Sequence, residues 1–166
     1  MPTETALLKA DFINPFVSSS LNVLQTMARV TPKVGKAYLK ESRSTWGVVS
    51  GVIGMAGNKV TGNVILSFDQ PCILEIVSNM LMEQFETISA DVVDAVGELT
   101  NMITGGAKTQ LGELGYVFEM ATPMMITGQN IELSQLSKAP VVVLPFDTSA
   151  GRFVIEASFA PAKGAE

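Results

Sequence analysis

The sequence predicts an α+β protein, folded as a three-layer α-β-α sandwich around a mostly antiparallel central sheet. The predicted elements run in the order helix, two strands, two helices and then several strands, which is typical of an α+β chain. The segment WGVVSGVIGM at residues 46–55 does not alternate between apolar and polar residues, so strands covered on both faces are expected. The 166 residues suit a single domain over 1–166, with residues 1–10 and 161–166 expected to be flexible.

Three helices are predicted, over about 15–28, 71–82 and 90–114. Asn14 is a suitable cap for the first helix, and Pro15 suits the first helical position because its missing N–H is not needed there. Asp69 can cap the second helix and Ser89 the third. Gly115 follows the third helix and is a common C-terminal stop.

Strands are predicted over 46–55, 61–68, 116–121, 124–127, 139–146 and 152–159. The first two form an antiparallel hairpin, since Gly57-Asn58 between them is a turn signal. The last two form another hairpin around residues 147–151. The segment RFVIEASF at 152–159 alternates, which places Phe153, Ile155, Ala157 and Phe159 on one face.

The residue types that are missing exclude whole classes of chemistry. With no histidine, the chain cannot hold an imidazole general base or a Cys/His zinc site. Its single cysteine, Cys72, cannot form an internal disulfide and is expected to be a small buried apolar residue. No signal peptide and no apolar run of about 18 residues is seen, so a cytoplasmic protein without membrane insertion is expected. The net charge of −5 argues against nucleic acid as the main partner.

The predicted helix over 90–114 has two distinct faces. At about 100° per residue, its core stripe is Val92, Val96, Leu99 and Ile103. The opposite stripe is Asp94, Glu98, Asn101, Gly105 and Lys108. Glu98 and Asn101 are three residues apart, so their side chains are neighbours on the same turn. A carboxylate and an amide with this spacing are common on solvated helices, so the spacing alone does not define a site.

Asn101, Gly105 and Gly106 are all unfavourable inside a helix, the glycines by roughly 1 kcal/mol each relative to alanine. A helix that contains all three either packs closely at that place or presents a surface to another molecule. For the two glycines, the approach of a partner and packing against the sheet explain the sequence equally well.

The residues around this stripe resemble a known family. The resemblance to the CheX/CheC/FliY family of chemotaxis phosphatases extends over nearly the whole chain and is closest to CheX-like members. It is carried by PKVGK at 32–36, VVSGVIGMAGNKVTGNVILSF at 48–68, GELTNMITGGAK at 97–108, LG at 114–115 and TPMMITG at 122–128.

The resemblance implies a phosphatase that hydrolyses the aspartyl phosphate of a CheY-type response regulator. The Glu and Asn of the family correspond to Glu98 and Asn101. Asn101 would orient the attacking water, since a neutral amide can both accept and donate a hydrogen bond. Glu98 would pair with the lysine beside the regulator's phosphorylation site. The regulator would supply Mg²⁺, so no cofactor of its own is expected, and CheX-like proteins are expected to be homodimers.

A second interpretation is a non-catalytic adaptor, flagellar-switch-like or regulatory, that binds the regulator without turnover. CheC-like members carry two Glu-x-x-Asn motifs, and the only other candidate here is Asp11-x-x-Asn14. We interpret Asn14 as a helix cap and assign this pair no catalytic role.

Three further features have structural explanations. The basic residues Lys33, Lys36, Lys40 and Arg43 are expected to form a solvated loop. Glycines at 47, 51, 54 and 57 are expected to let a helix approach the sheet, since no phosphate-binding glycine motif is present. The nine methionines are expected to fill the core, with an adaptable binding surface as the alternative.

Overall fold

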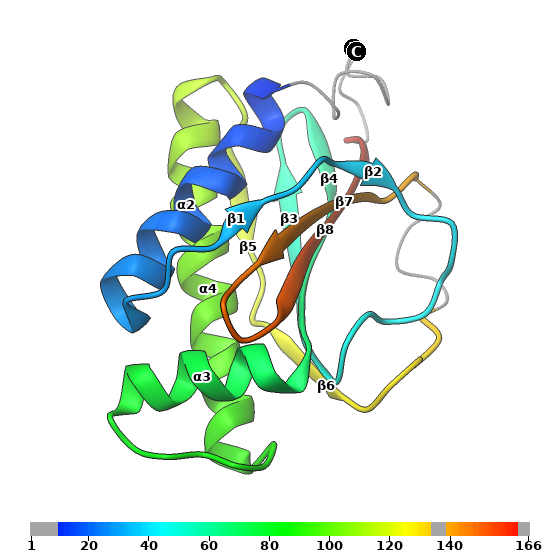
Figure 1. Cartoon of the computed structure of the whole chain (residues 1–166). Coiled ribbons are helices and arrows are strands. Elements are labelled where there is room, and N and C mark those ends of the chain that lie inside the picture. Colours follow the sequence, from blue (N-terminus) through cyan, green and yellow to red (C-terminus); the bar gives the residue numbers. More distant parts are fainter. Residues whose placement is uncertain (1–9, 134–138, 163–166) are drawn as a thin grey trace.

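The computed structural model describes residues 10–133 and 139–162, and it has the predicted α+β class (Figure 1). Its elements are, in chain order, α2 (Ala10–Ala28), β1 (Lys33–Val34), β2 (Tyr38–Leu39), β3 (Val49–Gly57), β4 (Val60–Phe68), α3 (Gln70–Leu81), α4 (Ala90–Glu113), β5 (Phe118–Met120), β6 (Met124–Thr127), β7 (Val142–Asp147) and β8 (Arg152–Pro161). Most of the ends that were expected to be flexible, residues 1–9 and 163–166, lie outside the described residues. Within the described part, no helix has the length and apolar character needed to cross a membrane.

All strands pair antiparallel in one sheet. The order is β1-β7-β8-β4-β3-β5, with β2 also pairing with β7 and β6 with β3. Both predicted hairpins are confirmed: Val52 lies opposite Ile65 in the first, and Phe146 opposite Phe153 in the second. The last strand of the chain, β8, lies in the middle of the sheet between β7 and β4.

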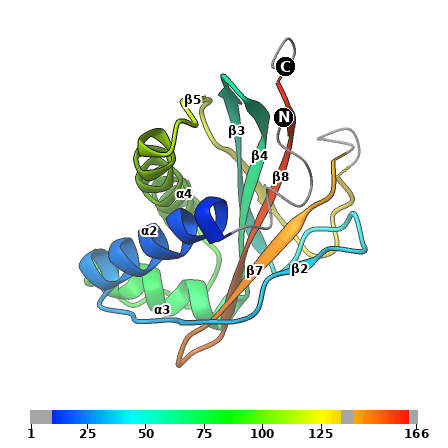
Figure 2. The ribbon, with the colours of Figure 1, turned by 90° about the horizontal axis from the view of Figure 1, so that it is seen from above.

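The three described helices all lie on one face of the sheet (Figure 2). The strand residues that face them form the core, including the predicted set Phe153, Ile155 and Phe159. Stacked rings fix the register of this layer, with ring centroids 4.6 Å apart for Phe146 and Phe153. Apolar burial on this scale is the main force that holds helices against a sheet.

The opposite face of the sheet is covered differently from the prediction. The connection from β2 to β3 and the residues after β6 lie on that side, and in the described residues no helix does (Figure 2). These two segments are joined to each other, because the Thr45 N–H donates to the Ile131 carbonyl at 2.8 Å. The described residues therefore form one of the two helical layers expected of the sandwich, and irregular chain buries the strands on the other side.

Helix α2 begins before Asn14, so the prediction that Asn14 caps this helix is wrong. The helix already includes Ala10, so Asn14 and Pro15 lie inside it. An interior proline removes a backbone hydrogen bond and costs roughly 3 kcal/mol. Phe12 supplies a compensating gain, because its buried ring packs edge-on against Tyr116 and Phe159 at 5.4 and 5.2 Å. Burial of the Phe12 ring thus stabilises the helical residues that precede Pro15.

Lys40 was expected in a solvated basic loop, but it is largely buried in an ion pair. Its ammonium donates to both carboxylate oxygens of Glu156, at 2.9 and 2.7 Å, and to the Ser44 carbonyl at 2.6 Å. Both side chains are largely buried, at 14% and 4% exposed. Burial raises the pKa of Glu156 and the Lys40 ammonium opposes that rise. This ion pair ties the β2–β3 connection to the sheet, whereas Lys33, Lys36 and Arg43 are exposed as predicted.

Candidate functional site

Helix α4 carries both predicted site residues, and its limits agree with the prediction. Ser89 caps it, since its hydroxyl accepts from the Val92 N–H at 3.4 Å. Asp91 lies in the first turn, where a negative charge is favoured by the helix dipole. Gly115 follows the helix with φ of +94°, a conformation that favours glycine and ends the helix.

Close packing on β3 fixes the rotation of α4 about its axis. Thr100 is fully buried, and its hydroxyl donates to the Val96 carbonyl at 2.8 Å within the helix. Opposite it, Gly51 has no room for a side chain, because a Cβ there would lie 2.1 Å from the Thr100 hydroxyl. This contact confirms that Gly51 lets the helix approach the sheet. It also turns the far stripe of α4 outward.

Three residues of the predicted outer stripe are exposed, and Gly105 and Lys108 are half-buried. Asp94, Glu98 and Asn101 all face solvent, while the predicted core residues Val92, Val96, Leu99 and Ile103 are fully buried. No hydrogen bond or ion pair joins the side chains of Glu98 and Asn101 to another described residue. A carboxylate and an amide therefore stand side by side with their polar atoms available to another molecule.

A groove of about 580 Å³ runs beside this pair. Its lining residues come from α3, α4 and the start of β6: Met80, Leu81, Asp91, Val93, Asp94, Ala95, Gly97, Glu98, Asn101, Pro123 and Met125. Gly97 lies next to Met125 of β6, where a Cβ would make an ordinary contact with the sulfur at 3.5 Å. The polar site residues of α4 are thus flanked by apolar residues from α3 and β6.

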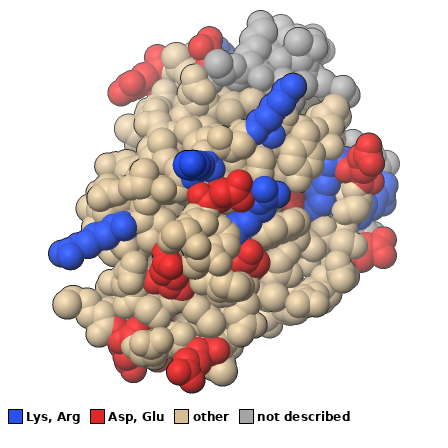
Figure 3. Space-filling view, in the orientation of Figure 1, with Lys and Arg blue, Asp and Glu red and all other residues tan. Residues whose placement is uncertain are grey.

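Negative charge dominates this groove. Asp91, Asp94 and Glu98 line it, and no lysine or arginine does. Asp94 and Glu98 are four residues apart on the helix, a like-charge spacing that destabilises a helix by about 0.2–0.5 kcal/mol. In Figure 3, the lower end of the molecule, where α4 begins in Figure 1, shows acidic and no basic side chains. The fold does not neutralise this charge within the described residues.

Gly105 and Gly106, whose role the sequence left open, have different surroundings. Gly106 packs against α2, because a Cβ there would lie 2.3 Å from the Ser19 hydroxyl oxygen. Gly105 has no atom within 4 Å of the corresponding position. Gly105 follows Asn101 by one turn on the exposed stripe, so it leaves bare backbone beside the amide.

The apolar wall of the groove was not predicted as part of the site. Its methionines, Met80 and Met125, were expected to fill the core; both are half-buried and pack against the core with part of the side chain, and among the described methionines only Met55 is fully buried. The available signal was the number of methionines in a chain with few charges. It could not show which of them reach the surface, because that depends on where α3 and β6 lie relative to α4.

Two other candidates take no part in the groove. Asp11 and Asn14 are both exposed on α2 but do not line it. Cys72 is buried as expected, and burial raises the pKa of its thiol to about 12. Among the described residues, no three cysteine, aspartate or glutamate side chains gather into a metal site.

The chemistry available to Glu98 and Asn101 is limited and specific. No serine, threonine, cysteine or lysine lines the groove, so the site offers none of these nucleophiles of its own. The amide can position a water molecule, and the carboxylate can bind a cation. Such a pair suits a reaction in which the substrate is already activated.

Comparison with solved structures first defines the class. A CheC-like superfamily protein from Shewanella sp. PV-4 has the same fold, with a TM-score of 0.84 and 45% identity over 92% of this chain and 99% of that chain. The fold is thus that of a CheC-like protein.

The family follows from the sequence match. The family described as chemotaxis phosphatase CheX matches residues 49–147, more than half of the chain, and the chain belongs to this family. It is accordingly a phosphatase. The CheY-P phosphatase CheX of Thermotoga maritima is 26% identical over 141 residues, which are 82% of this chain and 90% of that protein. A chain of the CheX-CheY-BeF3-Mg+2 complex from Borrelia burgdorferi matches with a TM-score of 0.75 and 26% identity, over 91% of this chain and 99% of that chain.

Proposed function

We propose that this protein hydrolyses the aspartyl phosphate of a CheY-type response regulator, with Asn101 orienting the attacking water and Glu98 anchoring the regulator. The observation that carries this proposal is the exposed, unengaged pair on a helix whose rotation is fixed by the contact of Thr100 with Gly51. The Thermotoga relative, named as a CheY-P phosphatase, and the Borrelia complex with CheY support the choice of substrate.

The substrate explains why so few groups suffice. Attack of water on phosphorus breaks the bond between phosphorus and the aspartyl oxygen, and the aspartate leaves as a stable carboxylate. Such a reaction depends mainly on the alignment of the water and on stabilisation of charge. The Asn101 carbonyl can accept a hydrogen bond from the water, which orients a lone pair of the water oxygen toward phosphorus. Because the amide is neutral, it does not repel the phosphoryl oxygens.

Glu98 has a different task, since a carboxylate facing the phosphoryl group would be repelled by it. We assign Glu98 to an ion pair with the lysine beside the regulator's phosphorylation site. We assign Mg²⁺ to the regulator. Binding and alignment are then divided between two neighbours on one helix turn.

The test replaces Asn101 with alanine and follows phosphate release from a phosphorylated CheY-type regulator. Turnover is expected to fall by about 10²–10³-fold, the usual cost of removing one positioned polar group. The control is Asn22→Ala, which removes another exposed asparagine from the middle of a helix, on α2. Equal turnover in the two variants would contradict the role of Asn101, and regulator binding without any turnover in the native protein would support an adaptor.

Glu98→Gln tests the anchoring role. It keeps the shape of the side chain and removes its charge, so KM is expected to rise by about tenfold, with a smaller change in kcat. The measurement is steady-state turnover over a range of regulator concentrations. A large loss of kcat at unchanged KM would instead place Glu98 in the chemical step.

We further propose a cytoplasmic homodimer, in keeping with the resemblance to CheX-like proteins. Size-exclusion chromatography with light scattering measures the mass in solution directly. A monomeric mass at micromolar concentration would contradict the dimer and leave the turnover proposal unaffected.

A further inference from the structure

We propose that the groove beside Glu98 is a docking site for an amphipathic segment of the phosphorylated regulator. This segment would place cationic side chains against Asp91 and Asp94 and an apolar side chain against Leu81. The inference rests on the proposed function and extends it from the reacting centre to the surface that selects the regulator.

The charge of the groove determines the first property of the partner. Asp91, Asp94 and Glu98 follow one another at intervals of three and four residues, along one side of α4. They have no ion-pair partner among the described residues. One lysine beside the phosphorylation site can neutralise Glu98, but it leaves the other two carboxylates. A regulator with further cations on that surface would neutralise them and approach faster through long-range attraction.

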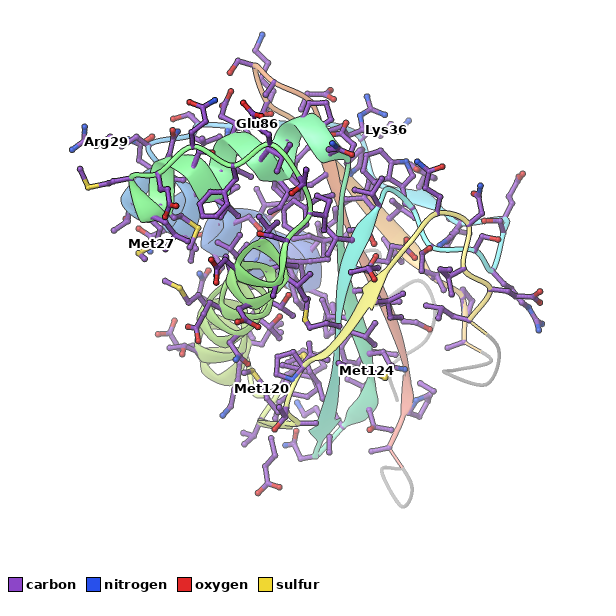
Figure 4. The ribbon with its side chains drawn as sticks, turned by 90° about the horizontal axis from the view of Figure 1, so that it is seen from below. Met27, Arg29, Lys36, Glu86, Met120 and Met124 are labelled. Atoms are coloured by element: carbon purple, nitrogen blue, oxygen red, sulfur yellow. The ribbon has the colours of Figure 1, made fainter. Side chains whose placement is uncertain are left out.

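The other wall determines the second property. The apolar groove residues flank the acidic row of α4: Met80 and Leu81 come from α3, where Leu81 is 47% exposed, and Pro123 and Met125 come from β6 and the residue before it. Figure 4 shows α4 between β6, where Met124 is labelled, and the ends of α2 and α3, where Met27 is labelled. Methionine side chains adapt their shape to a partner at little cost. An apolar side chain that enters here would remove the wall from water.

A second copy of this chain fits the groove poorly. In a two-fold symmetric contact, the same surface meets itself. The groove has three carboxylates and no cation along its lining, so such a contact would bring like charges together. The charge of the groove therefore favours a partner of opposite charge.

The first test removes two charges without changing the size of the side chains. In Asp91→Asn/Asp94→Asn, KM for the phosphorylated regulator is expected to rise by about tenfold at low salt, with kcat within twofold. High salt should remove the difference, because it screens the attraction. The matched control is Glu113→Gln/Glu119→Gln, which changes the net charge equally at exposed positions outside the groove.

The second test addresses the apolar wall. Leu81→Ser is expected to raise KM severalfold without changing kcat. Leu114→Ser is its control, since the two leucines are 47% and 48% exposed and Leu114 does not line the groove. Melting temperatures of all four variants show whether a change in KM comes from docking or from folding.

The outcomes separate this inference from the proposal beneath it. If Asn101→Ala abolishes turnover while the groove variants behave like their controls, the docking site is wrong and the phosphatase proposal stands. If Asn101→Ala leaves turnover unchanged, the proposed function itself fails. If the groove variants instead change the mass in solution, the groove binds a second copy, which overturns the docking inference.

Discussion

At the scale of single residues, two adjacent glycines in α4 have opposite surroundings. Gly106 faces α2 at a distance that excludes a side chain, and Gly105 faces open space beside Asn101. A helix interior gains roughly 1 kcal/mol when glycine is replaced by alanine, unless the new methyl group clashes. No packing contact among the described residues explains the absence of a side chain at Gly105, and because this glycine lies one turn after Asn101 we expect the regulator to approach it.

Gly105→Ala is expected to stabilise the protein by about 0.5–1 kcal/mol and to slow turnover at least severalfold. The stabilisation follows from the helix backbone, and the slower turnover from a methyl group between Asn101 and the regulator. Gly112→Ala is the control, because Gly112 also has no atom within 4 Å in the same helix. Urea unfolding and phosphate release measure the two effects. Normal turnover in Gly105→Ala would show that the bare backbone is not needed.

Gly106→Ala is expected to destabilise the protein, by about 1–3 kcal/mol, in spite of the same gain in helix propensity. The new methyl group would displace Ser19, whose hydroxyl donates to the Ile103 carbonyl at 2.6 Å across the α2–α4 contact. The measurement is again urea unfolding. A stabilised Gly106→Ala would show that α2 can move away freely.

At the scale of elements, the β2–β3 connection depends on one buried ion pair. Lys40→Met is expected to cost about 3–5 kcal/mol, because it leaves the Glu156 carboxylate buried without a counter-charge. Lys40→Met/Glu156→Leu is expected to recover most of this loss. Urea unfolding of the two variants and the native protein measures the coupling. A double variant as unstable as the single one would mean that the connection is held by other contacts.

The same pair predicts a pH dependence. Burial raises the pKa of Glu156 in the folded protein above its unfolded value, and Lys40 opposes that rise. In Lys40→Met the opposition is lost, so the folded-state pKa rises further. Below the unfolded-state pKa, near 4.5, the carboxyl is neutral in both states and there is no charge penalty. As pH rises through the folded-state pKa, the penalty becomes complete. The destabilisation of Lys40→Met relative to the native protein should thus be larger at pH 8 than at pH 4.5.

Elements also show where prediction from the sequence was accurate and where it was not. The caps Asp69 and Ser89 and the stop at Gly115 depend on neighbouring residues, and all three are confirmed. The start of α2 and the state of Lys40 were wrong, because each depends on a residue far away in the chain, Phe159 or Glu156. The outer stripe of α4 was predictable from periodicity, but the apolar wall opposite it required the positions of α3 and β6.

At the scale of the whole molecule, Cys72 reports on global unfolding. The thiol lies in the first turn of α3 and is fully buried, and burial raises its pKa to about 12, so little reactive thiolate forms near neutral pH. Alkylation by iodoacetamide at pH 8 is expected to be at least about a thousandfold slower in the native protein than in urea, since it requires an opening that costs several kcal/mol. Rapid modification of the native protein would show that α3 opens locally.

The place of β8 in the sheet has a consequence for synthesis on the ribosome. The long hairpin of β3 and β4 can form early. The other edge of β4, with its segment VILSF, stays unpaired until β8 has been made. Helices α3 and α4 are made in the meantime and have only that hairpin to cover. Nascent chains of this protein therefore expose an aggregation-prone edge until β8 has been made and pairs with β4.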